Sequence, residues 1–211
     1  MMADILSEIS ENLQNGKAKV VAELVGKAIE QGLPPQKILD EGLLAGMGII
    51  GTKFKANEIF VPEVLVAARA MNKGAEVLKP KLAAEGIKAK GKAVIGTVKG
   101  DLHDIGKNLV KMMMEGRGIE MIDLGVDVPA SKFVDAAKEN DVPLVCCSAL
   151  LTTTMGEIKG VIDAFKEAGA RDKVKIMIGG APVTQAFCDQ IGADSYSPDA
   201  ASAAEAAVAF I

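Results

Sequence analysis

Hydrophobic residues recur at helical spacing through roughly the first 85 positions of the chain. Four segments carry apolar residues three and four positions apart, which is the spacing of one face of an α-helix. Gly32 ends the second segment, and Pro34 and Pro35 stand where the third begins. The four segments span residues 3–14, 17–31, 35–55 and 61–84. Four amphipathic helices with short connections predict a four-helix bundle.

The rest of the chain alternates between short apolar runs and helical patterns. The runs of strand length are 93–98, 119–124, 143–149 and 174–178, with a weaker one near 194–197. The helical patterns that follow them lie near 105–116, 130–140, 155–169, 183–191 and 199–210. Five such βα units predict an α/β domain: a flavodoxin-like (Rossmann-like) parallel sheet of strand order 2-1-3-4-5, with helices on both faces. A ligand is expected at the carboxyl ends of the first and third strands.

A stretch without a sustained apolar period separates the two patterns. Residues 79–92 contain Pro80, Gly86, Gly91 and several lysines, and the part from 83 to 92 predicts an interdomain linker. We therefore expect an all-α domain over residues 1–88 and an α/β domain over residues 89–211.

Composition narrows the classes of partner. The 24 Lys and Arg against 28 Asp and Glu give a net charge of −4, which argues against broad binding to nucleic acid or to an anionic membrane. The first ten residues lack the features of a signal peptide, and no apolar run approaches the ~20 residues of a membrane span. We expect a cytoplasmic protein with neither a nucleic-acid nor a membrane partner. Its core must be aliphatic, because aromatic residues make up only 3% of the chain.

The single histidine of the chain, His103, follows the first predicted strand. The segment from Gly100 to Asn108 could be a phosphate-binding loop, but it has five residues before Gly106-Lys107 where that motif has four, and Asn108 replaces Ser or Thr. A structural interpretation makes Asp101 or Asp104 a helix cap and His103 ordinary loop surface.

Metal ligation is the third interpretation of this loop. A neutral imidazole is a good ligand for a transition metal, and a neighbouring carboxylate fixes its tautomer. One histidine cannot by itself hold a bare ion in a closed site, but it can supply one axial bond to a metal already held by a macrocycle.

Three motifs in order now resemble a known family. Asp101-x-His103-x-x-Gly106 matches the DxHxxG signature of cobalamin-binding domains, and Ser148-Ala149-Leu150 and Gly179-Gly180 match its second and third signatures. The helical half is similar to the four-helix cobalamin cap of methionine synthase and of small corrinoid methyl-carrier proteins. The residues that carry this second similarity are Gly46-Met47, Gly51, Phe54 and Phe60-Val61-Pro62.

The resemblance implies roles for individual residues. His103 would replace the dimethylbenzimidazole of cobalamin as lower ligand to cobalt (base-off, His-on binding), Asp101 would accept its other ring N–H, and the Thr154 hydroxyl would extend this relay. The residues of this loop that would bind the cofactor are Gly100, Asp101, Leu102, His103, Asp104, Ile105 and Gly106. The channel of the nucleotide tail would be lined by Ser148, Leu150, Thr152, Gly179 and Gly180 and closed by Ala200. Phe54 and Val61 would cover the upper face of cobalt.

Plainer interpretations stand beside these roles. Glycine and serine are common in turns at strand ends, and Phe54 and Val61 could be core packing. Val61 is also smaller than the leucine that is common in the family at that position.

The resemblance also implies a function. The protein would carry a methyl group, as methyl-Co(III) (methylcobalamin), from a substrate-specific methyltransferase to a second methyltransferase. The donor would be a methylamine, methanol, a betaine or a methoxylated aromatic, and the acceptor coenzyme M or tetrahydrofolate, as in methanogenesis or acetogenesis. A reductive activation protein is a further expected partner, and the chain would be a non-autonomous subunit.

Three other classes of protein remain as alternatives. The first is a cobalamin-dependent sensor, although such proteins usually add a basic DNA-binding module. The second is the small subunit of an adenosylcobalamin mutase, which normally lacks the cap. The third is a flavodoxin-like fold without a cofactor.

Overall fold

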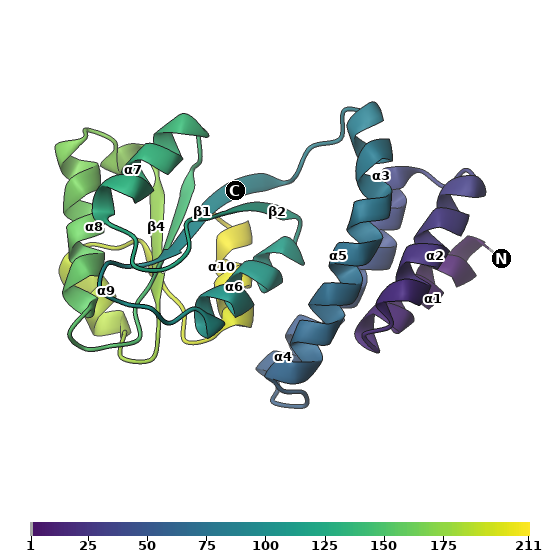
Figure 1. The fold of residues 1–211 in the computed structure, drawn as a ribbon, viewed down its shortest axis with the longest axis horizontal. Coiled ribbons are helices and arrows are strands. Elements are labelled where there is room, and N and C mark those ends of the chain that lie inside the picture. Colours follow the sequence, from purple (N-terminus) through teal and green to yellow (C-terminus); the bar gives the residue numbers. More distant parts are fainter. Residues whose placement is uncertain (1) are drawn as a thin grey trace. The chain divides into compact units, whose positions relative to one another are not determined.

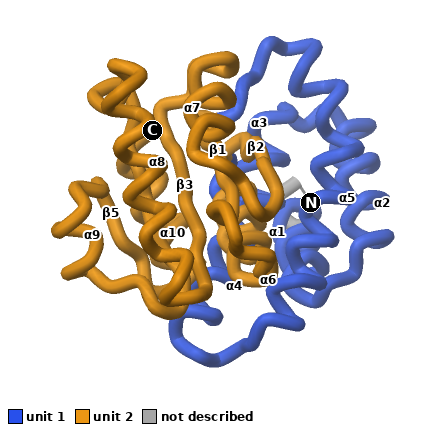
Figure 2. Tube along the Cα trace, turned by 60° about the vertical axis from the view of Figure 1, so that its left-hand side comes forward, with its two compact units in different colours: residues 1–89, 116–118 blue, residues 90–115, 119–211 orange. Residues whose placement is uncertain are grey.

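The computed structural model describes the backbone of residues 2–211 and the side chains from residue 5 onward. Met1, which the sequence assigns to the helical domain, lies outside the described residues. The chain forms two compact units: residues 1–89 with 116–118, and residues 90–115 with 119–211 (Figure 2). Each unit is described by itself below.

The first unit is helical, as the apolar spacing predicts. Its helices include α1 (Met2–Gln14), α2 (Ala18–Glu30) and α5 (Val61–Ala84). The predicted helix 35–55 is continuous but not uniform: α3 (Pro35–Lys37) passes into the π-helical segment η1 (Ile38–Leu44) and then into α4 (Ala45–Lys55). A wider π turn shifts the register by one residue, which an averaged apolar spacing does not reveal.

The second unit contains a sheet with helices packed around it (Figure 1). Its strands are parallel and have the predicted order β2-β1-β3-β4-β5. The strands are β1 (Gly91–Thr97), β2 (Ile119–Asp123), β3 (Leu144–Ser148), β4 (Lys175–Gly179) and β5 (Ser195–Tyr196). The register sets Thr97 beside Ser148 and Ser148 beside Gly179. The carboxyl ends of three neighbouring strands therefore meet at one edge.

Helices follow the strands in the expected alternation. They are α6 (Ile105–Glu115), α7 (Ala130–Glu139), α8 (Met155–Glu167), α9 (Gln185–Ile191) and α10 (Ala200–Val208), with a short 3₁₀ turn, η2 (Arg171–Lys173). Helix α6 packs beside α10, and α7 packs beside α8 (Figure 1). This arrangement confirms the predicted α/β architecture.

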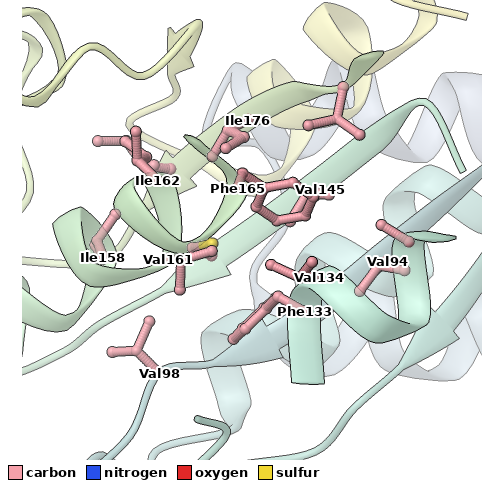
Figure 3. Packing of buried hydrophobic residues seen from close by; sticks show 14 of the residues in the cluster. Val94, Val98, Phe133, Val134, Val145, Ile158, Val161, Ile162, Phe165 and Ile176 are labelled. Carbon is pink, nitrogen blue, oxygen red and sulfur yellow. The ribbon is translucent and has the colours of Figure 1, made fainter. Parts of the chain in front are cut away.

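The core of the second unit is mainly aliphatic (Figure 3). Val94 and Val145 come from the sheet, Ile162 and Phe165 from α8, and Phe133 from α7, and each is fully buried. Burying a side chain of this size stabilises the fold by about 1.5–3 kcal/mol before entropy is counted. The carboxyl edge of the sheet is therefore held by a tightly packed base.

The connection between the units is shorter than predicted. Helix α5 runs to Ala84 even though it contains Pro80, and β1 begins at Gly91. The stretch between them spans residues 85–90 instead of the expected 83–92. In the described part of the chain, no helix combines the length and apolar character that crossing a bilayer requires.

Candidate functional site

His103 lies in the loop that joins β1 to α6, at the carboxyl edge of the sheet. Two hydrogen bonds tie this loop to the strand ends: the Thr97 hydroxyl donates to the His103 carbonyl at 2.8 Å, and the Val98 N–H donates to the Ser148 carbonyl at 3.0 Å. The histidine backbone is held in this way, while 52% of its side chain is exposed. The imidazole can therefore reach a ligand outside the protein surface.

Asp101 is fully buried beneath His103 and joins two loops. Its Oδ1 lies 3.0 Å from His103 Nδ1, and its Oδ2 accepts hydrogen bonds from the Leu150 N–H and the Thr154 hydroxyl, each at 2.7 Å. The His103 and Leu151 N–H groups also donate to this carboxylate, at 3.1 and 3.3 Å. The structure thus brings together the three residues of the predicted relay, His103, Asp101 and Thr154.

The environment of Asp101 favours its ionised form. Burial alone would raise the pKa of this carboxyl group, but the hydrogen bonds from Leu150, Thr154 and His103 hold its pKa well below the usual range. A carboxylate at this position can accept the proton of Nδ1, and Nε2 is then the ring nitrogen that is free to accept a bond.

The surroundings of His103 fit a macrocycle that brings its own metal. Leu102 and Ile105, on either side of the histidine, expose 72% and 73% of their surface. Apolar side chains so exposed at the mouth of a site suit a large flat ligand. Within the described residues, no group of three or more His, Cys, Asp or Glu side chains could hold a bare metal ion.

The predicted tail residues lie at the same edge as the histidine. Ser148 and Gly179 end neighbouring strands, and Leu150 and Thr152 follow in the exposed loop after β3. Gly180 has φ +127°, and a Cβ added there would lie 1.8 Å from the Ala149 carbonyl oxygen. The turn at Gly180 therefore requires glycine, so that two loop backbones can approach each other.

The remaining predicted residues have different settings. Gly100, Asp104 and Gly106 lie in or beside the His103 loop and are exposed. Ala200 begins α10 with a buried side chain. The two residues predicted for the upper face, Phe54 near the end of α4 and Val61 at the start of α5, are half-buried parts of the helical unit.

Three contacts that support the His103 loop are not predicted by the sequence. The N–H of Leu151, the hydroxyl of Thr97 and the side chain of Asp127 all hold the His103 loop; Asp127 Oδ1 accepts the Gly100 N–H at 2.7 Å. Asp127 has φ +53°, a conformation that aspartate tolerates better than most residues. The direction of an amide or of a turn depends on the path of the loop, which residue types alone do not indicate.

The structure also bears on the two alternatives for this loop. Lys107 is 2% exposed and its Nζ lies 2.6 Å from Asp123 Oδ1, so it is not available to phosphate groups as a P-loop lysine would be. The structural interpretation accounts for the hydrogen bond from the His103 N–H to Asp101. It does not account for an exposed imidazole whose Nδ1 meets a buried carboxylate.

The fold and this edge together define a cofactor-binding protein of the flavodoxin-like type. Residues 91–208 match the family described as "B12 binding domain", and residues 5–79 match a second family of that description. The chain is 44% identical over 205 residues to dimethylamine corrinoid protein 3 of Methanosarcina acetivorans, covering 96% of both chains. It is 41% identical over 199 residues to trimethylamine corrinoid protein 1 of the same organism, covering 93% of this chain and 92% of that one.

Solved structures agree with these relatives. The methanol:cobalamin methyltransferase complex MtaBC of Methanosarcina barkeri contains a chain with a TM-score of 0.88 and 33% identity, and the match covers 99% of this chain and 81% of that one. A cobalamin-binding protein of Desulfitobacterium hafniense gives a TM-score of 0.81 and 31% identity over 98% of both chains. The chain belongs to the family of corrinoid proteins with B12-binding domains, and its cofactor is a cobalamin.

Proposed function

We propose that this protein carries a methyl group between two methyltransferases, with cobalamin bound in base-off form and His103 as lower ligand. The observation that carries the proposal is the hydrogen-bonded series His103–Asp101–Thr154 beneath an exposed imidazole. When bound, the cofactor supplies a cobalt centre that accepts a methyl group from one partner and gives it up to the other. The chain itself is a subunit that needs both partners.

The residues of the series have separate tasks. Asp101 Oδ1 holds the proton on His103 Nδ1, which keeps Nε2 unprotonated and able to coordinate. The Thr154 hydroxyl and the backbone N–H groups keep Asp101 ionised, so its carboxylate remains an acceptor for the His103 Nδ1–H. Leu102 and Ile105, exposed beside the histidine, would exclude water from the bound cofactor.

The other predicted residues are proposed for the remainder of the cofactor. Ser148, Leu150, Thr152, Gly179 and Gly180 would line the channel of the nucleotide tail, and Ala200 would close it. Phe54 and Val61, in the helical unit, would cover the upper face. This assignment makes residues 1–88 the cap and residues 89–211 the cobalamin-binding domain.

A methylated amine is the donor that the relatives favour. Two of them, at 41% and 44% identity, are named for trimethylamine and dimethylamine, and the methanol complex matches at 33%. The acceptor enzyme would pass the methyl group to coenzyme M or tetrahydrofolate, and a reductive activation protein would return oxidised cobalt to the cycle.

Electron paramagnetic resonance of the Co(II) form tests the ligand assignment. The protein is labelled with ¹⁵N in its single histidine and loaded with cobalamin. We expect a superhyperfine splitting that changes with the label in the parent and is absent in His103→Ala, with cobalamin still bound. A splitting insensitive to the label would overturn base-off, His-on binding.

A methyl-transfer assay tests the donor. The loaded, reduced protein is mixed with a dimethylamine- or a methanol-specific methyltransferase and its substrate, and methylation of the cobalt is followed by its visible absorption. We expect faster methylation with the dimethylamine enzyme. A faster reaction with the methanol enzyme would contradict the amine assignment.

A further inference from the structure

Lys107 is a buried lysine in the first turn of α6, four residues after His103. Its Nζ donates to Asp123 Oδ1 at 2.6 Å and to Asn108 Oδ1 at 2.7 Å. Burying an ammonium group is costly unless it is paired, and the first turn of a helix is an unfavourable place for a cation. Neither helix formation nor core packing accounts for a lysine at this position.

Asp123, the partner of Lys107, is the last residue of β2, and its carboxylate accepts hydrogen bonds from several donors. Its Oδ1 also accepts the Gly125 N–H at 2.9 Å, and its Oδ2 lies 3.3 Å from Lys111 Nζ. Burial would raise the pKa of Asp123, but the hydrogen bonds from Lys107 and Gly125 and the two lysine charges lower it. Asp123 is therefore held in its ionised form beside the Lys107 Nζ.

Hydrogen bonds continue from this pair to the histidine loop. The Gly125 carbonyl accepts the Thr97 N–H at 3.0 Å, and the Thr97 hydroxyl donates to the His103 carbonyl at 2.8 Å. The chain from 103 to 107 closes the path into a ring. The ring runs from Lys107 through Asp123, Gly125 and Thr97 to His103, and the Lys107–Asp123 pair is its charged link.

We propose that the Lys107–Asp123 ion pair positions His103 for coordination and thereby sets how much of the bound cobalt carries the histidine. The inference rests on the proposed role of His103 as lower ligand. Lys107 and Asp123 are positioning residues: they act on the backbone of the histidine through the ring, and the imidazole–cobalt bond is the contact they support. Partners in the outer shell of a metal site commonly change ligation by about 10–100-fold.

The variants Lys107→Met and Asp123→Asn test this inference in the full chain loaded with cob(II)alamin and labelled with ¹⁵N-histidine. We expect the ratio of histidine-bound to histidine-free Co(II), read by paramagnetic resonance, to fall by about tenfold, the lower end of that range. The Co(II)/Co(I) midpoint potential should become less negative, because histidine then stabilises Co(II) less. Asp123→Asn preserves the side-chain shape and decides the matter if Lys107→Met does not fold.

A second ion pair in the same unit provides the matched control. Arg171 Nη2 lies 2.7 Å from Asp194 Oδ2, with side chains 19% and 16% exposed, at the opposite end of the strands. Arg171→Met and Asp194→Asn should lower the midpoint of unfolding while leaving the histidine-bound ratio and the potential at parent values. An equal fall of the ratio in these controls would reduce Lys107 to a general stabilising role and overturn the inference.

The same experiment distinguishes failure of His103 ligation from failure of the positioning role of the Lys107–Asp123 pair. A parent signal that is insensitive to the histidine label refutes His103 ligation itself, and the inference with it. A label-sensitive parent together with an unchanged ratio in both Lys107→Met and Asp123→Asn refutes the positioning role alone.

Discussion

A single buried carboxylate joins two loops that lie about 50 positions apart in the sequence. Asp101 receives the His103 ring on one oxygen, and on the other it receives the Thr154 hydroxyl and the Leu150 and Leu151 amides. Because these donors come from the loops that follow the adjacent strands β1 and β3, the group that contacts the histidine ring also fastens the two loops together. Orientation and local stability therefore depend on the same side chain.

Replacing Asp101 by Asn should change how stability depends on pH. The pKa of Asp101 is lowered in the folded state, so its contribution is present above the unfolded value near pH 4 and is lost as the pH falls towards the folded value. Asp101→Asn should lower the free energy of unfolding by about 2 kcal/mol at pH 7, since hydrogen bonds to a charged group are lost. Below about pH 4, the free energy of unfolding of the variant should fall less steeply with pH than that of the parent. Urea unfolding at a series of pH values measures the loss at pH 7 and the slope below pH 4. If the free energy of unfolding of the variant and of the parent ran parallel over this pH range, the lowered pKa of Asp101 would be contradicted.

Two glycines in the second unit should respond oppositely to alanine. At Gly180 a Cβ meets the Ala149 carbonyl oxygen, whereas at Gly160, within α8, nothing lies within 4 Å. Gly180→Ala should cost about 3 kcal/mol or more of stability, and Gly160→Ala should gain about 0.5–1 kcal/mol from its better helix propensity. Thermal unfolding of both variants decides the point; a Gly180→Ala protein as stable as the parent would exclude the close approach of the two loops.

At the level of elements, most of this fold was readable from apolar spacing. The runs that form β1, β3 and β4 are continuous and mostly buried, which is typical of strands covered on both faces. The π-helical segment η1 was missed, because a one-residue widening of a helix leaves little trace in a periodic pattern.

The limits of sequence reasoning show also at β5 and in the loops. The expected run near 194–197 forms only two residues of strand, Ser195–Tyr196, which pair with β4 at the margin of the sheet. Residue type and motif indicate His103 and Asp101, and the resemblance to the cobalamin-binding family indicates Thr154. The amides and Asp127, which hold these residues in place, depend on loop geometry and are not indicated in this way.

The start of α10 provides a test of a single element. Asp199 is its N-cap: Oδ1 accepts the Ser202 N–H at 2.8 Å, and Oδ2 accepts the Ser202 hydroxyl at 2.8 Å. Asp199→Ala should lower the free energy of unfolding by about 1 kcal/mol, whereas Asp199→Asn, which keeps a cap acceptor, should stay near the parent. Equal losses in the two variants, measured by denaturant titration, would show that the negative charge matters more than the cap.

At the scale of the whole molecule, two compact units are joined by residues 85–90. Lys88 and Lys90 are exposed in this stretch, outside any helix or strand. Brief trypsin treatment should therefore cut first there and release a helical and an α/β fragment, identified by mass spectrometry. In Lys88→Gln/Lys90→Gln the first cut should be slower; early cleavage inside α5 in the parent would argue against two separately packed units.

The two margins of the sheet have a consequence for behaviour in concentrated solution. A strand at a margin offers unpaired backbone groups to other chains, and proteins counter this with short strands or charges. β5 is two residues long, and β2 at the other margin carries Glu120, 3.7 Å from Lys92, and the charged Asp123. Both margins are in this way protected against edge-to-edge adhesion between copies of the chain.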